Sequence, residues 1–173
     1  MLSLPCCSLL ISSTLIIVGH YELSSSSSEG ESSEKEEETA KKQRVGGVSL
    51  LSHNLDLHCF KDLPHGVLSM VWIEEGTSML ASLASGEVAK LTVREGEEGG
   101  WGVEVVQSVL IDAGAIATDC TLMGSGEAAV ALTNGSIAIL NLEGKGEVDC
   151  WEGCHNFRGV PSEVWVSGRC PLV

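Results

Sequence analysis

The chain has 173 residues and a formal net charge of −14, and 43% of its residues are hydrophobic. This length fits one domain or part of one, and the apolar share is sufficient for a core. The excess of acidic side chains excludes general binding to nucleic acid or to anionic membrane surfaces, because both need a basic protein surface. The charge suits a basic protein partner, although solubility alone explains it equally well.

Seven cysteines are distributed irregularly through the chain. Because they are too sparse for a disulfide scaffold, we expect reduced thiols and a cytoplasmic protein. Cys150, Cys154 and His155 form a partial set of metal ligands, but a fourth ligand and the usual Cys-x2-Cys spacing are missing. We therefore expect no metal and no cofactor.

An apolar run near the N-terminus, Leu9–Val18, resembles the core of a signal peptide in composition. However, no Lys or Arg precedes it and no small-residue cleavage site follows it. The run is also too short to span a bilayer. Because Thr14–Val18 is rich in β-branched residues, we predict a buried strand there and assign residues 1–23 to the first strands of the fold.

Residues 24–44 are a low-complexity segment of Ser, Glu and Lys in which Ala40 is the one apolar residue. Such a composition cannot offset the entropy cost of ordering, so we predict a disordered acidic loop between two strands. Several serines have an acidic residue three positions on, as Ser26 has Glu29, which is a pattern that acid-directed kinases favour. A solvated loop expansion explains the same residues.

From residue 45 to residue 155 the chain reads as short strands separated by turns. Glycines fall at the joints, and few segments keep helical spacing for more than two turns, so the pattern predicts an all-β fold. The expected strands are Val45–Leu51, Leu55–Phe60, Gly66–Ile73, Met79–Leu83, Glu87–Val93, Trp101–Ile111, Ala115–Leu122, Ala128–Leu132, Ser136–Leu142 and Glu147–Trp151.

An internal repeat narrows the all-β class. Ala81–Val93 aligns with Ala129–Asn141, each having an apolar strand, a tight turn with glycine and a second, alternating strand. The turn glycines Gly86 and Gly135 are 49 residues apart. Periods of about 40 to 50 residues with four strands per unit are typical of WD40 or kelch blades. We therefore favour an incomplete WD40-type β-propeller, with about three blades of a ring of roughly seven, over a β-sandwich.

Ser85 and Asn134 each precede a turn glycine. WD40 blades usually carry an aspartate at this position, which accepts a hydrogen bond from a histidine before the first strand. Asn134 is expected to replace that acceptor, and Ser85 to do so less well. His65 and His155 are accordingly better explained as blade residues than as catalysts.

The chain contains no nucleophile elbow, P-loop, dinucleotide fingerprint or His-Glu-x-x-His motif. Trp72 and Trp151 are better explained by packing between blades than by contact with a ligand. Taken alone, the residues support a binding platform rather than an enzyme.

Several stretches resemble, in order, the diphthine methyl ester hydrolase family of WD40-repeat proteins (also named as a diphthine methyltransferase family). The most distinctive is Trp151 with His155, followed by Glu163 and Trp165, which is similar to a Trp-x-x-His-Asp-x-Glu-x-Trp run of that family. The other similar segments are Ile16–Leu23, Val45–Leu51, Gly66–Trp72 and Ala131–Leu140.

The resemblance implies an enzyme that hydrolyses the methyl ester of diphthine on translation elongation factor 2, a step of diphthamide biosynthesis. This reaction needs an activated water and an oxyanion donor. By the resemblance, His155 is the candidate base, and Glu163 is either its orienter or a contact for the substrate's quaternary ammonium. Trp151 and Trp165 are the candidate residues that bind this cation. The alternatives are a non-catalytic WD40 scaffold for protein–protein interaction and an inactive fragment.

Residues 156–173 form a divergent tail that includes the start of a further blade. Arg158–Ser162 looks like an insertion relative to the family, and the residues after Trp165 do not continue its pattern. A truncated gene model lacking about half of the propeller would explain both features. The sequence leaves the oligomeric state open.

Overall fold

The computed structural model describes residues 6–23, 44–96, 99–124, 126–144, 148–157 and 160–161. Within these ranges every regular element is a β-strand, and the strands form three four-stranded antiparallel sheets and one two-stranded sheet. The predicted all-β class is therefore confirmed. No helix of the described residues is long and apolar enough to cross a membrane.

Each four-stranded sheet is made of four consecutive strands in chain order, as a propeller blade is. Blade 1 comprises β1 (Cys6–Ile11), β2 (Ile16–Leu23), β3 (Arg44–Leu51) and β4 (Leu57–Leu63). Blade 2 comprises β5 (Val67–Glu74), β6 (Ser78–Leu83), β7 (Glu87–Glu95) and β8 (Trp101–Leu110). Blade 3 comprises β9 (Ala117–Gly124), β10 (Glu127–Leu132), β11 (Ile137–Asn141) and β12 (Val148–Trp151). The short strands β13 (Asn156–Phe157) and β14 (Val160–Pro161) pair with each other.

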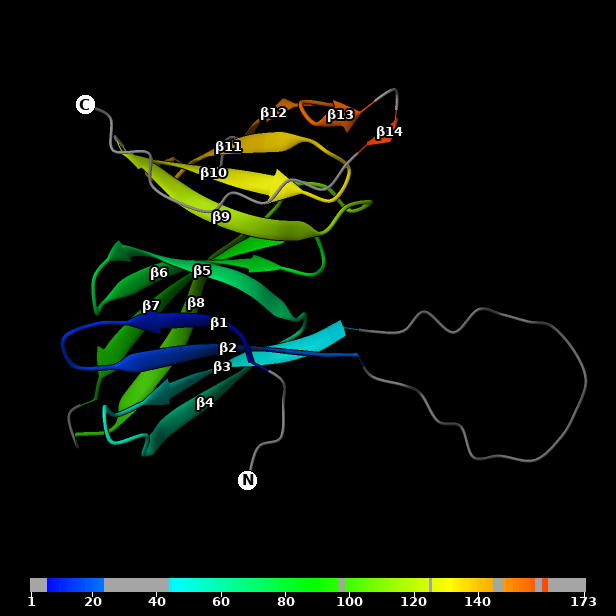
Figure 1. Cartoon of the computed structure of the whole chain (residues 1–173). Helices are drawn as coiled ribbons and strands as arrows, with labels where there is room; N and C mark the ends of the chain where they lie inside the picture. The colour runs from blue at the N-terminus through cyan, green and yellow to red at the C-terminus, as the bar shows by residue number, and fades with distance from the viewer. Residues whose placement is uncertain are drawn as a thin grey trace, which may run out of the picture.

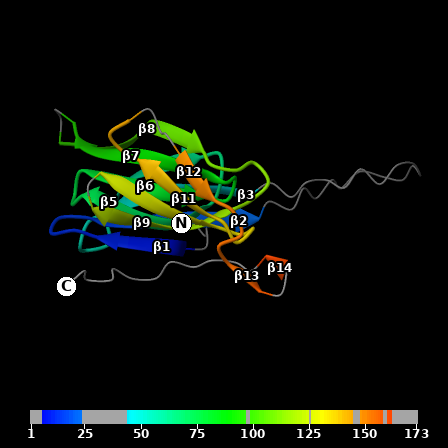
Figure 2. The ribbon, with the colours of Figure 1, turned by 90° about the horizontal axis from the view of Figure 1, so that it is seen from above.

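The three blades are stacked face to face, with blade 2 between the other two (Figure 1). Viewed along the stack, blade 3 lies over blade 2 (Figure 2). The first strand of blade 2, β5, contacts β1 of blade 1 on one side and β9 of blade 3 on the other. The first strands thus run next to one another, which is how strands line the axis of a propeller.

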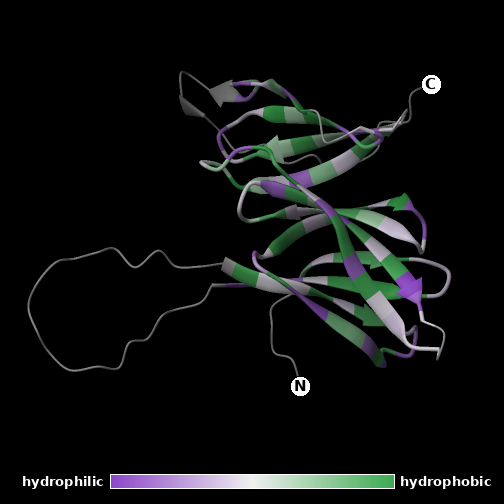
Figure 3. Cartoon of the chain, turned by 180° about the vertical axis from the view of Figure 1, so that it is seen from behind, coloured by the Kyte–Doolittle hydropathy of each residue, from purple (hydrophilic) through white to green (hydrophobic). Residues whose placement is uncertain are grey.

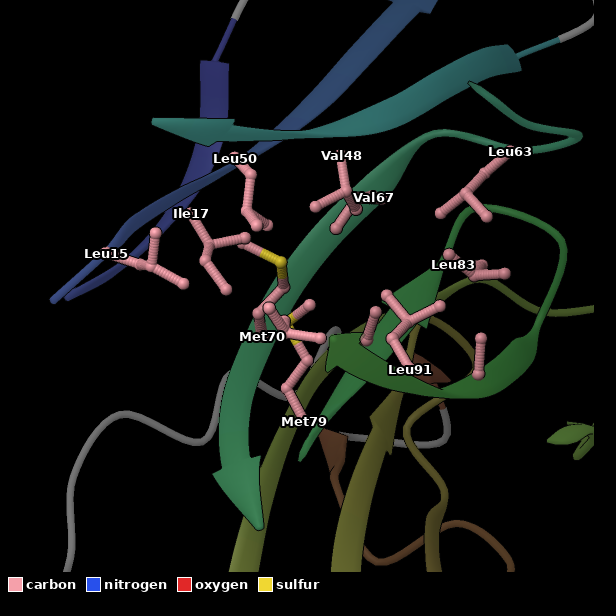
Figure 4. Close-up of a cluster of buried hydrophobic side chains, with 13 residues drawn as sticks. Leu15, Ile17, Val48, Leu50, Leu63, Val67, Met70, Met79, Leu83 and Leu91 are labelled. Atoms are coloured by element: carbon pink, nitrogen blue, oxygen red, sulfur yellow. The ribbon is translucent and has the colours of Figure 1, made fainter. Parts of the chain in front are cut away.

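Two apolar cores hold the stack together. Between blades 1 and 2, side chains such as Ile17 and Leu50 point toward Val67 and Met79 (Figure 4), and all four are buried. A second core between blades 2 and 3 includes Leu80, Val88, Ala117, Cys120, Val130 and Leu140. Burying one such large aliphatic side chain stabilises the fold by about 1.5–3 kcal/mol, so stacking rather than pairing within a blade supplies most of the apolar stabilisation.

The pattern of buried and exposed residues along a strand depends on where the strand lies in the stack. Residues 79–83 of β6 are all buried, because this strand is central in its sheet and its sheet is central in the stack. The outer strand β8 instead alternates between half-buried and exposed residues, and the hydropathy colours change along the strands in the same way (Figure 3). Continuous apolar runs therefore mark the central strands, and alternation marks the outer ones.

The ten strands predicted after residue 45 correspond to β3–β12. Residues 1–23 were assigned to the first strands of the fold, but the one strand predicted within the apolar run Leu9–Val18 was Thr14–Val18, so β1 had no predicted bounds of its own. The chain instead turns at Ser12, whose hydroxyl oxygen accepts hydrogen bonds from the N–H groups of Thr14 and Leu15 at 3.3 and 3.0 Å. Residues 24–43 of the predicted acidic loop, and most of the tail predicted at residues 156–173, lie outside the described residues.

Candidate functional site

The turn between β10 and β11 is fixed by two residues. Gly135 has a φ of +80°, a left-handed conformation that glycine adopts without steric cost, and its N–H donates to the Leu132 carbonyl at 3.1 Å. The side-chain amide of Asn134 forms two hydrogen bonds, one through its oxygen and one through its nitrogen. Its oxygen accepts the Ser136 N–H at 3.0 Å, and its Nδ2 donates to Oδ2 of Asp112 at 2.8 Å.

Asp112 lies in the loop that leads from blade 2 to blade 3. Its Oδ1 accepts the Gly114 N–H at 2.7 Å, so both carboxylate oxygens have a neutral donor. The same loop rests on the turn of blade 2, where the Ile111 N–H donates to the Gly86 carbonyl at 3.0 Å. Asp112 therefore connects the turn of one blade to the turn of the next.

The observed hydrogen-bond partners of the two turns differ from those expected. Asn134 was expected to act as an acceptor for a histidine, but its side chain donates to Asp112, because an aspartate occupies the loop before the first strand of blade 3. In blade 2 the Ser85 hydroxyl is buried without a hydrogen-bond partner among the described residues, so the weaker acceptor role predicted for it is not realised. A serine side chain is shorter than that of aspartate and reaches less far across the loop.

An open cleft of about 730 Å³ lies at this end of blade 3. Three separate segments line it: the loop after β8, the β10–β11 turn, and the end of β12 with the residues that follow it. Its volume lies in the range typical of ligand-binding pockets. The lining residues are Ile111, Asp112, Ala113, Asn134, Ser136, Cys150, Glu152 and Gly153.

The cleft is acidic. Asp112 and Glu152 both line it; the pKa of the Cys150 thiol is raised above its ordinary value, first by desolvation and then by the negative charges of Glu152 and Asp112. Among the described side chains the Lys and Arg residues are Lys61, Lys90 and Arg94, and none of them lines the cleft. The ion pair between Arg94 and Glu104, at 3.4 Å, joins β7 to β8 of blade 2 instead. The negative charge of the cleft is thus uncompensated within the described part of the chain.

The structure places two of the four predicted site residues next to this cleft. His155 is exposed and follows Gly153 by two positions, and its backbone N–H donates to the Gly135 carbonyl at 3.0 Å. Trp151 ends β12 and is 59% exposed. Glu163 and Trp165 lie outside the described residues, so the roles predicted for them stay predictions.

The predicted packing of tryptophans between blades holds for one of the two residues. Trp72 of β5 packs against the core shared by blades 1 and 2, and its Nε1 donates to the Ile11 carbonyl of blade 1 at 3.2 Å. Trp151 is largely exposed, so the expectation that it packs between blades is wrong for the described structure. The reason is its place on β12, the outermost strand of its sheet.

Sequence reasoning did not single out Asp112, Ser136 or Glu152. One signal was available for Asp112, since an acidic residue stands before blade 3 where WD40 blades usually carry a histidine. Glu152 and Ser136 carry no such signal, because only the fold brings them to the same cleft. No group of three or more His, Cys, Asp or Glu side chains suited to a metal ion occurs among the described residues.

Comparison with known proteins bears on the fold of the chain. No protein-family model and no curated protein matches this chain. A crystal structure of Sqt1 from Chaetomium thermophilum is similar, with a TM-score of 0.62 and 10% sequence identity over 91% of this chain and 37% of Sqt1. A second structure, of Sqt1 from the same organism bound to the N-terminus of the ribosomal protein L10, has a TM-score of 0.54 and 9% identity over 92% of this chain and 42% of Sqt1.

These identities are too low to carry more than the fold. The chain spans about two fifths of the length of the two Sqt1 structures. With its three stacked four-stranded blades, the chain is an incomplete WD40-type β-propeller, as the repeat in its sequence predicted.

Proposed function

We propose that this chain is a protein-interaction module: a propeller scaffold that binds a partner and has no catalytic role of its own. The observation that carries the proposal is the open acidic cleft at the turn end of blade 3, assembled from three segments of the chain. Loops held on a rigid sheet scaffold are common binding sites. That a propeller with a similar fold, Sqt1, has been solved with the N-terminus of the ribosomal protein L10 supports this reading.

The charge of the chain suggests the kind of partner. A net charge of −14 favours a basic protein and raises its association rate through long-range attraction. The cytoplasm, where the thiols at Cys150 and Cys154 would remain reduced, is the proposed location.

Two purified proteins test the proposal directly. Translation elongation factor 2 is the partner implied by the sequence resemblance, and the N-terminal segment of ribosomal protein L10 is the one suggested by the fold. Saturable binding of either to the immobilised chain, without release of methanol from a methyl-esterified factor, is the expected result. Absence of saturable binding to both would contradict an interaction role for this fold with these partners.

Diphthine methyl ester hydrolysis is the second candidate function. One observation favours keeping it: the predicted base His155 lies next to the acidic cleft, and the substrate carries a quaternary ammonium that negative charge would attract. The test is methanol release from methyl-esterified elongation factor 2. Release that is lost in His155→Ala would support this function, whereas equal release by both proteins would refute the role of His155.

A further inference from the structure

The carboxylate of Asp112 is held in place before any ligand arrives. The Gly114 N–H and the Asn134 amide fix its two oxygens at 2.7 and 2.8 Å. Both donors are neutral, so the full negative charge remains, and each oxygen keeps a lone pair for another donor. Such preorganisation lowers the entropy cost of binding a cation.

Glu152 supplies a second negative charge from a different wall of the cleft. It follows β12, whereas Asp112 precedes β9, so the two carboxylates come from opposite ends of the chain of blade 3. Within the described residues neither forms an ion pair. Two carboxylates that line one cleft repel each other, and a bound cation would relieve that repulsion.

Ser136 provides an independent indication that the cleft takes a polar ligand. This residue is 3% exposed and lines the cleft. Its N–H and carbonyl are used in the turn, but its hydroxyl has no hydrogen-bond partner among the described residues. This hydroxyl is not among the fully buried side-chain atoms that lack a partner, so it reaches the cleft and is available to a ligand N–H group.

We propose that this cleft binds the primary ammonium group of a basic peptide, either a lysine side chain or an N-terminal amine, between Asp112 and Glu152 and beside the Ser136 hydroxyl. An ammonium has three donors, which matches these three oxygen-bearing groups. The cleft volume of about 730 Å³ is far larger than a bare cation and has room for neighbouring peptide residues. Ile111 and Ala113 line the same cleft and offer apolar surface to the methylene stem of a lysine.

A guanidinium is a poorer ligand than an ammonium here. Its planar fork binds best to a carboxylate with both oxygens free for two parallel hydrogen bonds. Both oxygens of Asp112 already accept a donor from the chain, which leaves space for single contacts rather than a bidentate pair. The site is therefore expected to prefer lysine over arginine.

The inference rests on the proposed interaction role. Its test distinguishes failure of the ammonium site from failure of the interaction role as a whole. The probe is a fluorescently labelled hexalysine peptide, titrated into the full chain and followed by anisotropy, with a fully acetylated hexalysine as the uncharged comparison. Glu152→Gln should weaken hexalysine binding roughly fivefold or more, as expected for loss of a charge-assisted contact. Glu75→Gln removes the same charge from the β5–β6 turn, at the opposite end of the strands, and should leave the affinity nearly unchanged.

Two further variants, Asp112→Asn and Ser136→Ala, are measured in the same hexalysine titration. Because Asp112 also holds the loop between blades, circular dichroism and an unfolding curve must accompany its variant. The exposed Glu152 has no hydrogen bond or ion pair among the described residues, so Glu152→Gln keeps the test valid even if Asp112→Asn unfolds. Ser136→Ala should weaken binding while leaving the fold intact.

Carbodiimide cross-linking locates the contact, since the reagent joins a carboxylate to a primary amine that touches it. Mass spectrometry should find the hexalysine amide at Glu152 or Asp112. Equal affinity of the Glu152→Gln and Glu75→Gln proteins, or cross-links spread over acidic residues elsewhere, would overturn the inference. If a purified partner binds wild type and Glu152→Gln equally, the interaction role stands and the ammonium site fails.

Discussion

Replacing Gly86 by alanine should destabilise the chain strongly, because the added methyl group meets backbone atoms at a tight turn. Gly86 has a φ of +80°, and a Cβ on it would lie 1.9 Å from the carbonyl oxygen of Asp112 and 2.5 Å from that of Ala115. Both contacts are with backbone, so no side-chain rotation relieves them. The loop between blades 2 and 3 must move away from the turn.

The expected loss follows from three contributions. A left-handed conformation costs an alanine about 1–2 kcal/mol. Displacing the loop breaks the hydrogen bond from the Ile111 N–H to the Gly86 carbonyl, worth roughly 1 kcal/mol. It also disturbs Asp112 and its bond to Asn134, so the total is roughly 3 kcal/mol or more, a large share of the about 5–15 kcal/mol that stabilises a typical domain.

Urea unfolding followed by tryptophan fluorescence measures this loss. Gly124→Ala is the matched control, because Gly124 has a φ of +79° but nothing lies within 4 Å of its added Cβ. The control should lose only about 1–2 kcal/mol. Equal losses in the two variants would refute the reasoning, since they would mean that the Asp112 loop yields without cost.

Three further predictions concern the cores and the first hairpin. Leu50→Ala should lower the free energy of unfolding by about 2–5 kcal/mol in the same urea assay, because Leu50 is fully buried between blades 1 and 2; a loss below about 1 kcal/mol would contradict that packing. Burial raises the pKa of the Cys120 thiol from 9.0 to about 12, so the unfolded chain ionises first and stability should fall as pH rises from about 9 toward 12. The slope should flatten in Cys120→Ala, and an unchanged slope would exclude this thiol as its cause. Ser12→Ala should cost about 1 kcal/mol through loss of the hydroxyl that closes the β1–β2 turn, and unchanged urea unfolding would show that the turn does not depend on it.

The repeat in the sequence was sufficient to predict blades 2 and 3. The turn glycines and the apolar strands around them gave strand positions close to those observed, as for Glu87–Val93 against the observed Glu87–Glu95 of β7. Local alternation and turn chemistry decide these elements, so they are readable from the chain. The N-terminal hairpin was predicted only in part: a strand was expected where β2 lies, but β1 was not separated from it because both strands are apolar. The polar turn at Ser12 was the signal that separates them.

The candidate site was much less predictable. Its position depends on which loops the stacking of the blades brings together, and nothing in the spacing of Asp112, Ser136 and Glu152 reveals that they share a cleft. The sequence did lead to the right turn through Asn134 and Gly135, but with the wrong partner. Whether an amide donates or accepts is decided by the residue opposite it, and that residue is fixed only in three dimensions.

Hydrogen exchange of the backbone amides, measured by NMR on the intact chain, tests the central claim that three sheets stack as propeller blades. The account predicts the slowest exchange in β6 and β10, which are the second strands of blades 2 and 3 and are buried, and faster exchange in the outer strands β8 and β12. Leu50→Ala should accelerate exchange in β6 together with β2 and β3, because they share one core. Fast and uniform exchange throughout β5–β11, or exchange in blade 1 that responds alone to Leu50→Ala, would contradict a stacked propeller.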